Sequence, residues 1–271
     1  MLAADLLRAA GERGIDVVAA ARDDLDVTDA ASVSTLLERE RPDTVVNCAA
    51  YTDVDGAEDD LEGAMAVNAA GARNVATAAA VVDAPVVYVS TDYVFDGSKG
   101  EPYVESDTPR PLSVYGQSKL AGEHETASAN PRHVIVRSSW LFGAGGGNFV
   151  ETMLKLAAEH GEARVVDDQV GCPTYTGQLA GALLELAGAT AGAYGVHHVA
   201  GGGACSWYEF ALEVFEQADV ECATTACASE EFPRAAARPA YSELVSEHPD
   251  TPRLPSWREG LGAYLAQRPG A

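Results

Sequence analysis

Short apolar runs of strand length recur along the chain, and stretches long enough for a helix separate them. The runs are DVVAA from Asp16, DTVVNCAA from Asp43, PVVYVST from Pro85, HVIVRSS from His133, ARVVD from Ala163 and YGVHHVA from Tyr194. Strands that alternate with helices pair in parallel, so this order predicts an α/β fold with a Rossmann-like, doubly wound parallel sheet. The runs are almost continuously apolar, which is typical of strands covered on both faces.

The segments between these runs carry the spacing of amphipathic helices. We expect a first helix over residues 2–10, ended by Gly11 and Gly14, because its apolar residues recur every three or four positions. Further helices are expected over residues 29–40, 57–82, 115–129 and 148–159, and two shorter ones over 207–217 and 257–266. Together with the strands, these helices predict a sheet with helices on both sides.

After residue 137 the alternation gives way to loops rich in glycine and proline. We therefore expect a dinucleotide-binding core over residues 1–137, which a segment near 163–200 rejoins. Residues 138–271 are expected to form mainly a smaller substrate-binding lobe, interleaved with the core. Ligands of open parallel sheets bind at the carboxyl ends of the strands, so the lobe is predicted to cover that edge.

The first predicted helix leads into a strand, which is the second half of a βαβ unit. The first strand and the glycine-rich turn that would hold the phosphates of a dinucleotide do not precede it. We interpret Met1 as a late-assigned or truncated start, and we expect poor cofactor affinity if the chain truly begins there. The later GAGGGNF from Gly143 follows the HVIVRSS run, too late in the chain for that turn, so we expect it to form a flexible loop over the substrate.

The formal net charge is −23, with 41 acidic residues against 18 basic ones, of which only three are lysines. An acidic surface of this kind repels nucleic acid and anionic lipid, and it predicts a halophilic protein working in a cytosol of high salt. No apolar run approaches the roughly 18 residues of a membrane span, and no signal peptide is recognisable, so we expect a cytoplasmic protein. The five cysteines form no C-x-x-C pair and the adjacent His197 and His198 suit two faces of a strand, so we expect reduced thiols and no metal.

Three residues with proton-transfer chemistry are predicted to meet at one sheet edge. Tyr115 and Lys119 are four residues apart, so on a helix they share a face. An ammonium group near a phenol favours the phenolate. Thr91 ends the strand PVVYVST, so a hydroxyl reaches the same crevice. Such a set suits the binding and protonation of a carbonyl oxygen.

This Ser/Thr and Tyr-x-x-x-Lys arrangement resembles the short-chain dehydrogenase/reductase superfamily, in its extended, sugar-nucleotide branch. Longer stretches narrow the resemblance to the dTDP-4-dehydrorhamnose reductase family, over about residues 2–218. These stretches are LDVTD, PDTVVNCAAYTDVDGAE, VNAAGARNVA, STDYVFDG, PLSVYGQSKLAGE, RSSWLFG, NFVETML, DQVGCPT and SWYEFA. The resemblance implies NAD(P)H-dependent reduction of the C4 keto group of a deoxysugar nucleotide, with dTDP-4-dehydro-L-rhamnose or a close relative as substrate, and a possible homodimer.

The resemblance also implies a role for each matching residue. Tyr115 would give a proton to the sugar C4 oxygen, Thr91 would hydrogen-bond the same oxygen, and Lys119 would hold the nicotinamide ribose and lower the tyrosine pKa. The substrate side would comprise Thr91, Asp92, Trp140 and Asn148. The cofactor side would comprise Arg22, Asp26, Val27, Ala49, Ala50, Tyr51, Tyr115 and Lys119. Arg22 follows the DVVAA strand, where a basic residue suits the 2′-phosphate of NADPH, although Asp23 and Asp24 come next.

Structural roles remain open for several of these residues. Asp26 could cap the helix that starts near residue 29, and Trp140 could be a core residue. Asn68 and Asn74 are expected to anchor backbone rather than to touch a ligand. Asn148 could cap the helix that follows it.

Two other functions compete with the reductase. The first is a 4,6-dehydratase or epimerase of the same branch. Dehydratases of this branch carry an acidic pair after the strand-end threonine, whereas here Asp92 is followed by Tyr93. A non-catalytic binding or regulatory subunit would explain the missing glycine turn. The presence of Thr91, Tyr115 and Lys119 argues against such a subunit, and the absence of the second acid argues against a dehydratase.

Overall fold

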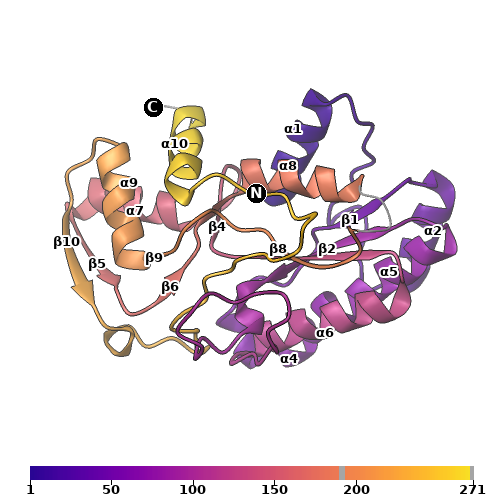
Figure 1. Cartoon of the computed structure of the whole chain (residues 1–271), viewed down its shortest axis with the longest axis horizontal. Coiled ribbons are helices and arrows are strands. Elements are labelled where there is room, and N and C mark those ends of the chain that lie inside the picture. The colour runs from indigo at the N-terminus through magenta and orange to yellow at the C-terminus, as the bar shows by residue number, and fades with distance from the viewer. Residues whose placement is uncertain (189–192, 269–271) are drawn as a thin grey trace.

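A computed structural model describes residues 1–188 and 193–268 of the chain. Its centre is a parallel sheet of four strands, β1 (Val45–Asn47), β2 (Val86–Thr91), β3 (His133–Ser138) and β8 (Gly195–His198), in the spatial order β1-β2-β3-β8 (Figure 1). β2 and β3 are the inner strands, so they are paired along both edges. The predicted α/β fold with a parallel sheet is confirmed.

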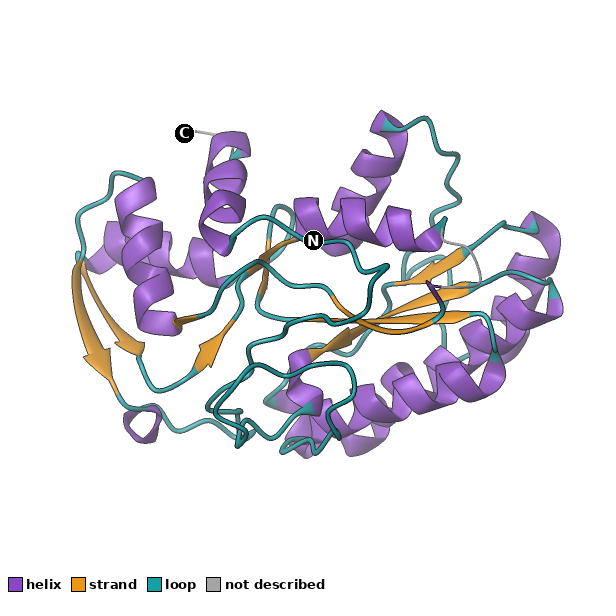
Figure 2. Cartoon of the chain, in the orientation of Figure 1, coloured by secondary structure: helices purple, strands orange, loops and turns teal. Residues whose placement is uncertain are grey.

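Helices cover both faces of this sheet (Figure 2). One face carries α2 (Ala30–Glu40), α5 (Ala72–Val81) and α6 (Val114–Ala129), and the other carries α1 (Leu2–Glu12) and α8 (Thr176–Ala187). On the α1–α8 side, Leu6, Leu179 and Leu183 pack on Val87 and Val134 of the sheet. These side chains are withdrawn from water, which is the main stabilising contribution to such a sandwich.

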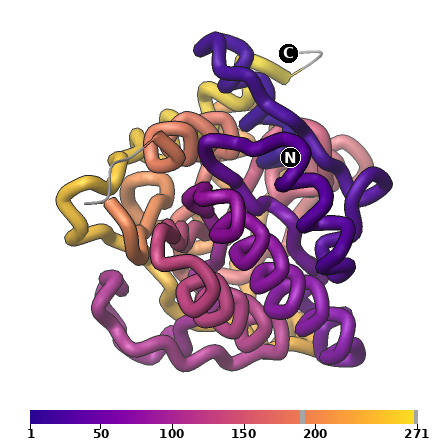
Figure 3. Tube along the Cα trace, turned by 90° about the vertical axis from the view of Figure 1, so that its right-hand side faces the viewer, coloured from indigo at the N-terminus to yellow at the C-terminus, as the bar shows by residue number. Residues whose placement is uncertain are grey.

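A smaller lobe follows, with three helices and three short strand pairs. The helices are α7 (Phe149–His160), α9 (Trp207–Gln217) and α10 (Trp257–Gln267). The strand pairs are β4 (Leu141–Phe142) with β7 (Thr174–Tyr175), β6 (Val170–Gly171) with β9 (Cys205–Ser206), and β5 (Glu162–Val166) with β10 (Ala223–Cys227). Its buried side chains form a separate cluster around Phe142, Phe210 and Trp257. Seen from the side, the helices of the first half of the chain lie in front of this lobe (Figure 3).

The predicted strand DVVAA is wrong. Residues 15–20 have an irregular conformation, and Ile15, Val17 and Val18 are 45%, 45% and 61% exposed. A strand is held by hydrogen bonds to a neighbour, and in the described residues β1 is paired only with β2. The apolar pattern therefore exists without the partner that would make it a strand.

Three other elements differ from the prediction. ARVVD forms β5, but β5 pairs with β10 in the smaller lobe and does not rejoin the main sheet. The helix expected over residues 57–82 is broken into α3 (Gly56–Asp59), α4 (Leu61–Met65), a π-helical segment (Ala66–Gly71) and α5. α8 was not predicted, although its buried Leu179, Leu183 and Leu186 have helical spacing. Of the helices in the described ranges, none is long and apolar enough to span a membrane.

Candidate active site

The candidate site lies where β2 ends and α6 begins. Thr91 is the last residue of β2, and Asp92–Val94 form a 3₁₀ turn directly after it. α6 starts at Val114, with Ser113 as its N-cap. Gly116 allows the helix to approach the turn closely, because a Cβ there would lie 2.2 Å from the carbonyl oxygen of Tyr93. The chain thus brings Tyr115 and Lys119 to the carboxyl end of β2.

Tyr115 lies beside the turn that follows β2. Its ring meets the edge of the Tyr93 ring, with centroids 6.0 Å apart and an interplanar angle of 80°. Burial raises the pKa of the phenol to about 12, and the hydroxyl of Thr91 opposes this shift. A phenol with this pKa is protonated at neutral pH, as a general acid must be.

Lys119 is turned into the sheet rather than toward the phenol. Its Nζ donates a hydrogen bond of 2.7 Å to the carbonyl oxygen of Val89 and lies 4.1 Å from the centroid of the Tyr88 ring. The side chain is buried, and burial lowers the pKa of the ammonium group to about 7. In this structure the hydroxyl of Thr91 lowers the pKa of Tyr115, and the predicted effect of Lys119 on that pKa stays a prediction.

Asp92 is buried behind Thr91. Its Oδ2 accepts a hydrogen bond of 2.6 Å from Ser242, and its Oδ1 lies 3.1 Å from the hydroxyl oxygen of Thr91. Burial raises the pKa of this carboxyl to about 7. Asp92 thus contacts the hydroxyl groups of Thr91 and Ser242. Its predicted contact with the sugar stays a prediction.

A buried ion pair joins α6 to β3, and the sequence analysis missed it. Glu123 is one turn of α6 beyond Lys119 and accepts hydrogen bonds from Arg137 of β3 at 2.9 and 2.7 Å. The same carboxylate accepts 2.5 Å from the hydroxyl of Ser90. The Nη1 of Arg137 lies 3.4 Å from Nε2 of His198 on β8. The signal that could have revealed the pair is Arg137, a charged residue within the apolar run of β3.

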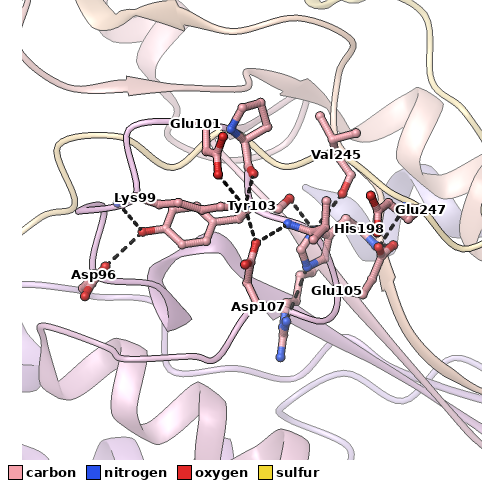
Figure 4. A network of polar contacts seen from close by, with 12 residues as sticks. Asp96, Lys99, Glu101, Tyr103, Glu105, Asp107, His198, Val245 and Glu247 are labelled. Atoms are coloured by element: carbon pink, nitrogen blue, oxygen red, sulfur yellow. Dashed lines mark hydrogen bonds and ion pairs between the residues drawn. The ribbon is translucent and has the colours of Figure 1, made fainter.

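The loop over residues 96–107 is fastened to the end of β8 and to the C-terminal segment (Figure 4). Glu105 accepts hydrogen bonds from the backbone N–H groups of His198 at 3.0 Å and Glu247 at 2.9 Å. The Nδ1 of His198 lies 3.1 Å from the carbonyl oxygens of both Tyr103 and Val245. Burial lowers the pKa of His198 to about 4, so the imidazole is neutral at neutral pH. Segments far apart in sequence are therefore held together by one polar network.

Within the same loop, Lys99 donates to Asp107 at 2.7 Å and to the carbonyl oxygen of Pro102 at 2.7 Å. The hydroxyl of Tyr103 donates to Asp96 at 2.9 Å (Figure 4). These contacts fix the shape of a long loop that has no regular secondary structure.

A second tie joins the loop after β1 to the C-terminal segment. Asp55 receives two hydrogen bonds from Arg238, at 2.6 and 2.9 Å, and one of 3.1 Å from the backbone N–H of Ala236. This pairing lowers the pKa of Asp55 to about 2. The guanidinium of Arg238 also faces the phenol of Tyr93, which contacts Tyr115. Sequence reasoning missed this pair because its members are far apart in the chain.

The predicted cofactor residues lie along the carboxyl side of β1 and on the loop before α2. Ala49 donates its backbone N–H to the side chain of Asn47 at 3.0 Å. Asn68 holds Tyr51, accepting from its N–H at 2.8 Å and donating to its carbonyl at 3.1 Å. Ala50 lies between these two anchored residues and is half-buried.

Val27 and Asp26 precede α2. Asn74 donates to the carbonyl oxygen of Val27 at 3.0 Å, so both asparagines anchor backbone, as expected. Asp26 accepts from the backbone and the hydroxyl of Thr28, whereas Asp29 caps α2 by accepting from Ala31 and Ser32. The alternative that Asp26 caps this helix is therefore wrong.

Arg22 is exposed on a turn in the same stretch. Its side chain faces solvent, so its predicted contact with a 2′-phosphate stays a prediction. Hydrogen bonds from Thr28 lower the pKa of the nearby Asp26 carboxyl, and the charge of Arg22 acts in the same direction.

On the opposite side, Trp140 belongs to an aromatic stack. Its ring lies parallel to that of Trp207, with centroids 3.5 Å apart, and its backbone has a φ of 48°. Gly171 makes room for this ring, since a Cβ there would lie 2.5 Å from it. Asn148 caps α7 by accepting from Glu151 at 3.1 Å and donates to the carbonyl of Gly143 at 2.9 Å. Its side chain is thus engaged in the capping role that was left open.

No group of three or more His, Cys, Asp or Glu side chains suited to a metal ion occurs within residues 1–188 and 193–268. His197 binds Thr251 and Ala193 while His198 faces Tyr103, so the two imidazoles do point to different surroundings. All five cysteines, which fall in the described ranges, are free thiols.

Comparison with known proteins identifies the family of this chain. Residues 1–269 match the family model described as the RmlD substrate binding domain. The chain belongs to the RmlD family. This confirms the resemblance drawn from the motifs, and it extends the match to nearly the whole chain.

Members of the RmlD family are similar to this chain over most of their length. The spore coat polysaccharide biosynthesis protein SpsK of Bacillus subtilis is 41% identical over 100% of this chain and 95% of its own. A dTDP-4-dehydrorhamnose reductase of Mycobacterium tuberculosis is 42% identical over 98% of this chain and 89% of its own. The crystal structure of dTDP-4-dehydrorhamnose reductase from Bacillus anthracis, in complex with NADP, superposes with a TM-score of 0.94 at 40% identity, covering 98% of this chain and 95% of that one.

A more distant neighbour shows the shared fold alone. The UDP-glucose 4-epimerase of Thermus thermophilus superposes with a TM-score of 0.80 at 19% identity, covering 100% of this chain and 96% of that one. The Rossmann-like fold is thus common to enzymes of different activity, so the activity has to be argued from the site.

Proposed function

We propose that this chain is an NADPH-dependent reductase of the C4 keto group of a dTDP-linked 4-keto-6-deoxy sugar, converting dTDP-4-dehydro-L-rhamnose or a close relative to dTDP-L-rhamnose. The observation that carries the proposal is the meeting of Thr91, Tyr115 and Lys119 at the carboxyl end of β2. Relatives about 40% identical over nearly the whole chain bear the name of this reductase, which supports the same substrate class.

The residues present fit the nicotinamide half of the cofactor. Lys119 offers a buried cationic donor and Tyr115 a half-buried phenol, at the edge where ligands of parallel sheets bind. The adenosine half would lie along Asp26, Val27, Ala49, Ala50 and Tyr51, with Arg22 near the 2′-phosphate. When bound, NADPH supplies the hydride that reaches the carbonyl carbon.

The chain's own residues would then act on the carbonyl oxygen. Tyr115 is protonated at neutral pH and would donate its proton to that oxygen as negative charge develops. Thr91, whose side chain is buried, would hydrogen-bond the same oxygen. Lys119 donates one hydrogen bond to the carbonyl of Val89, and its remaining N–H donors would hold the ribose.

The direct test mixes the full chain with NADPH and a dTDP-4-keto-6-deoxy sugar and follows the loss of the absorbance of the reduced cofactor. Tyr115→Phe should lower kcat by roughly 10²–10⁴-fold, because general acid catalysis contributes about that factor. A loss below about tenfold would contradict the assignment of Tyr115 as the acid.

The same experiment separates the competing functions. Binding of both ligands without turnover would favour a non-catalytic binding subunit. Release of water from a dTDP-hexose without net consumption of NADPH would favour a dehydratase, although Tyr93 stands where such an enzyme carries a second acid.

Two finer proposals concern the surroundings of the protein and its assembly. We propose that the enzyme works in the cytoplasm of a salt-rich cell, where ions screen a net charge of −23 and free thiols stay reduced. We further propose a homodimer, which light scattering at high salt would test against a monomer of 28.2 kDa.

A further inference from the structure

Asp92 is a buried carboxyl group whose side-chain partners are both hydroxyl groups. It is 2% exposed, its Oδ2 accepts from Ser242 at 2.6 Å, and its Oδ1 lies 3.1 Å from the oxygen of Thr91. In the described ranges of the chain, Asp92 forms no ion pair. Ionisation would therefore leave a charge in the interior without a cation beside it.

The titratable groups that face Asp92 are uncharged at neutral pH. They are Tyr93 in the same turn, Tyr115 of α6 and Cys172 between β6 and β7, and burial raises the pKa of each. On the C-terminal segment, the cation Arg238 faces Tyr93 and is bound to Asp55. In keeping with this surrounding, burial raises the pKa of Asp92 to about 7.

The hydroxyl of Thr91 has one proton, and the state of Asp92 decides where it points. The Thr91 oxygen already accepts a hydrogen bond of 3.2 Å from the backbone N–H of Tyr93. An ionised Asp92 can only accept hydrogen bonds, so the Thr91 hydroxyl donates its hydrogen bond to Asp92. A protonated Asp92 can donate to the Thr91 oxygen through Oδ1, which frees the Thr91 proton to point toward Tyr115 and the substrate.

We propose that Asp92, held by Ser242, is a positioning residue whose protonated form turns the hydroxyl of Thr91 toward the reacting carbonyl oxygen beside Tyr115. The proposal rests on the proposed function for the identity of that oxygen. The hydrogen bond between Asp92 and Thr91 does not depend on the proposed function, because it is present without substrate. The proposal assigns a role to Ser242, in the C-terminal third of the chain, that the sequence motifs did not reveal.

Infrared spectroscopy tests the proton without any turnover. The full wild-type chain, titrated from about pH 5 to about pH 9, should lose a protonated-carboxyl band as the pH rises through neutrality, and Asp92→Asn should lack this band. Ser242→Ala removes a donor to the carboxylate, so the midpoint of the same band should move to higher pH. Identical titrations of all three proteins would overturn the proposal, as would a wild-type chain without the band at acid pH.

The pH dependence of kcat tests the positioning role. Wild-type kcat should fall as the pH rises through about 7, and Asp92→Asn should keep measurable turnover without that fall, because its amide can donate to Thr91 and accept from Ser242. Lys119 titrates in the same window, so a fall that persists unchanged in Asp92→Asn belongs to Lys119 and overturns the proposal.

Two controls keep the outcomes separate. Thr91→Val should reduce kcat at every pH without removing the infrared band, because it deletes the group that Asp92 positions. If Asp92→Asn does not fold, the midpoints of wild type and Ser242→Ala decide alone: an upward shift supports the proposal and equal midpoints overturn it. If the chain does not reduce the sugar, the infrared titration still stands, which distinguishes failure of this inference from failure of the proposed function.

Discussion

Lys119, which we propose to hold the ribose of the cofactor, carries a charge whose burial is unfavourable for folding. The side chain is 2% exposed, and its partners are a carbonyl oxygen and the face of Tyr88 rather than a carboxylate in direct contact. Burial disfavours the charged form of a lysine, and this is the largest cause of its lowered pKa. At the residue scale, the site therefore keeps a group that opposes folding in its charged state.

We predict that Lys119→Met abolishes reductase activity and stabilises the chain. The pKa of Lys119 is about 7 in the folded chain and about 10.4 when unfolded, so the folded state binds fewer protons between these values. The charged ammonium thus costs stability in full below about pH 7, and the cost disappears as the pH approaches the unfolded value. The gain in Tm of Lys119→Met should be a few °C near pH 6 and shrink toward pH 10.

Thermal melts of both proteins across this pH range check the prediction. Lys155→Met is the matched control, because Lys155 lies on the exposed side of α7 and should give no pH-dependent gain. A Lys119→Met protein that melts lower than wild type at pH 6 would contradict the argument.

At the element scale, α6, β2 and β3 are joined by one buried ion pair. Glu123 and Arg137 are each almost inaccessible to solvent, and they share Ser90 as a neighbour just before Thr91. Arg137 also lies over the ring of Phe95, at 5.1 Å from its centroid. The pair therefore fixes the position of α6 relative to the strand that ends in Thr91.

We predict that Glu123→Gln destabilises the chain by about 3–5 kcal/mol, because it leaves the charge of Arg137 buried and unpaired. The double variant Glu123→Gln with Arg137→Met should recover part of the loss, since it removes both charges. Urea denaturation of the two single variants, the double variant and wild type measures the coupling. A double variant no more stable than Glu123→Gln would show that the unpaired charge is not the cause.

The helices differ in how accurately the sequence predicts their bounds. α2, α7, α9 and α10 begin at side-chain caps, Asp29, Asn148, Ser206 and Ser256, and all four were predicted within one or two residues. The stretch over residues 57–82 was predicted as one helix, because its alanine-rich composition hides the breaks at Asp60 and in the π-helical segment. There Asn68 is buried and bonded to Tyr51 and Ser118, a contact that a local pattern cannot contain.

At the scale of the whole molecule, the net charge of −23 repels itself across the folded surface. We predict that the Tm rises as KCl is raised from about 0.1 M to about 2 M, because screening shortens the range of this repulsion from about 10 Å to below about 3 Å. Melts in KCl check this, with sucrose as a control that stabilises folded chains without screening charge. A Tm that is insensitive to KCl would contradict the proposed adaptation to salt.

Local patterns alone determined much of this protein. The parallel sheet follows from apolar runs separated by helices, and the placement of Thr91, Tyr115 and Lys119 at one edge follows from strand ends and helical periodicity. Both depend on interactions between residues near in sequence, or on the rule that parallel strands end at a common edge.

Other features were decided only by the tertiary structure. Whether Val17 and Val18 form a strand depends on a partner beside them, and whether ARVVD joins the main sheet depends on where β10 lies. The direction of the Lys119 ammonium, the hydrogen bond from Ser242 to Asp92 and the pairing of Arg238 with Asp55 join residues that are distant in the chain or set by packing. The sequence contains these side chains but not their distances, because burial and partner geometry arise only when the segments have packed together.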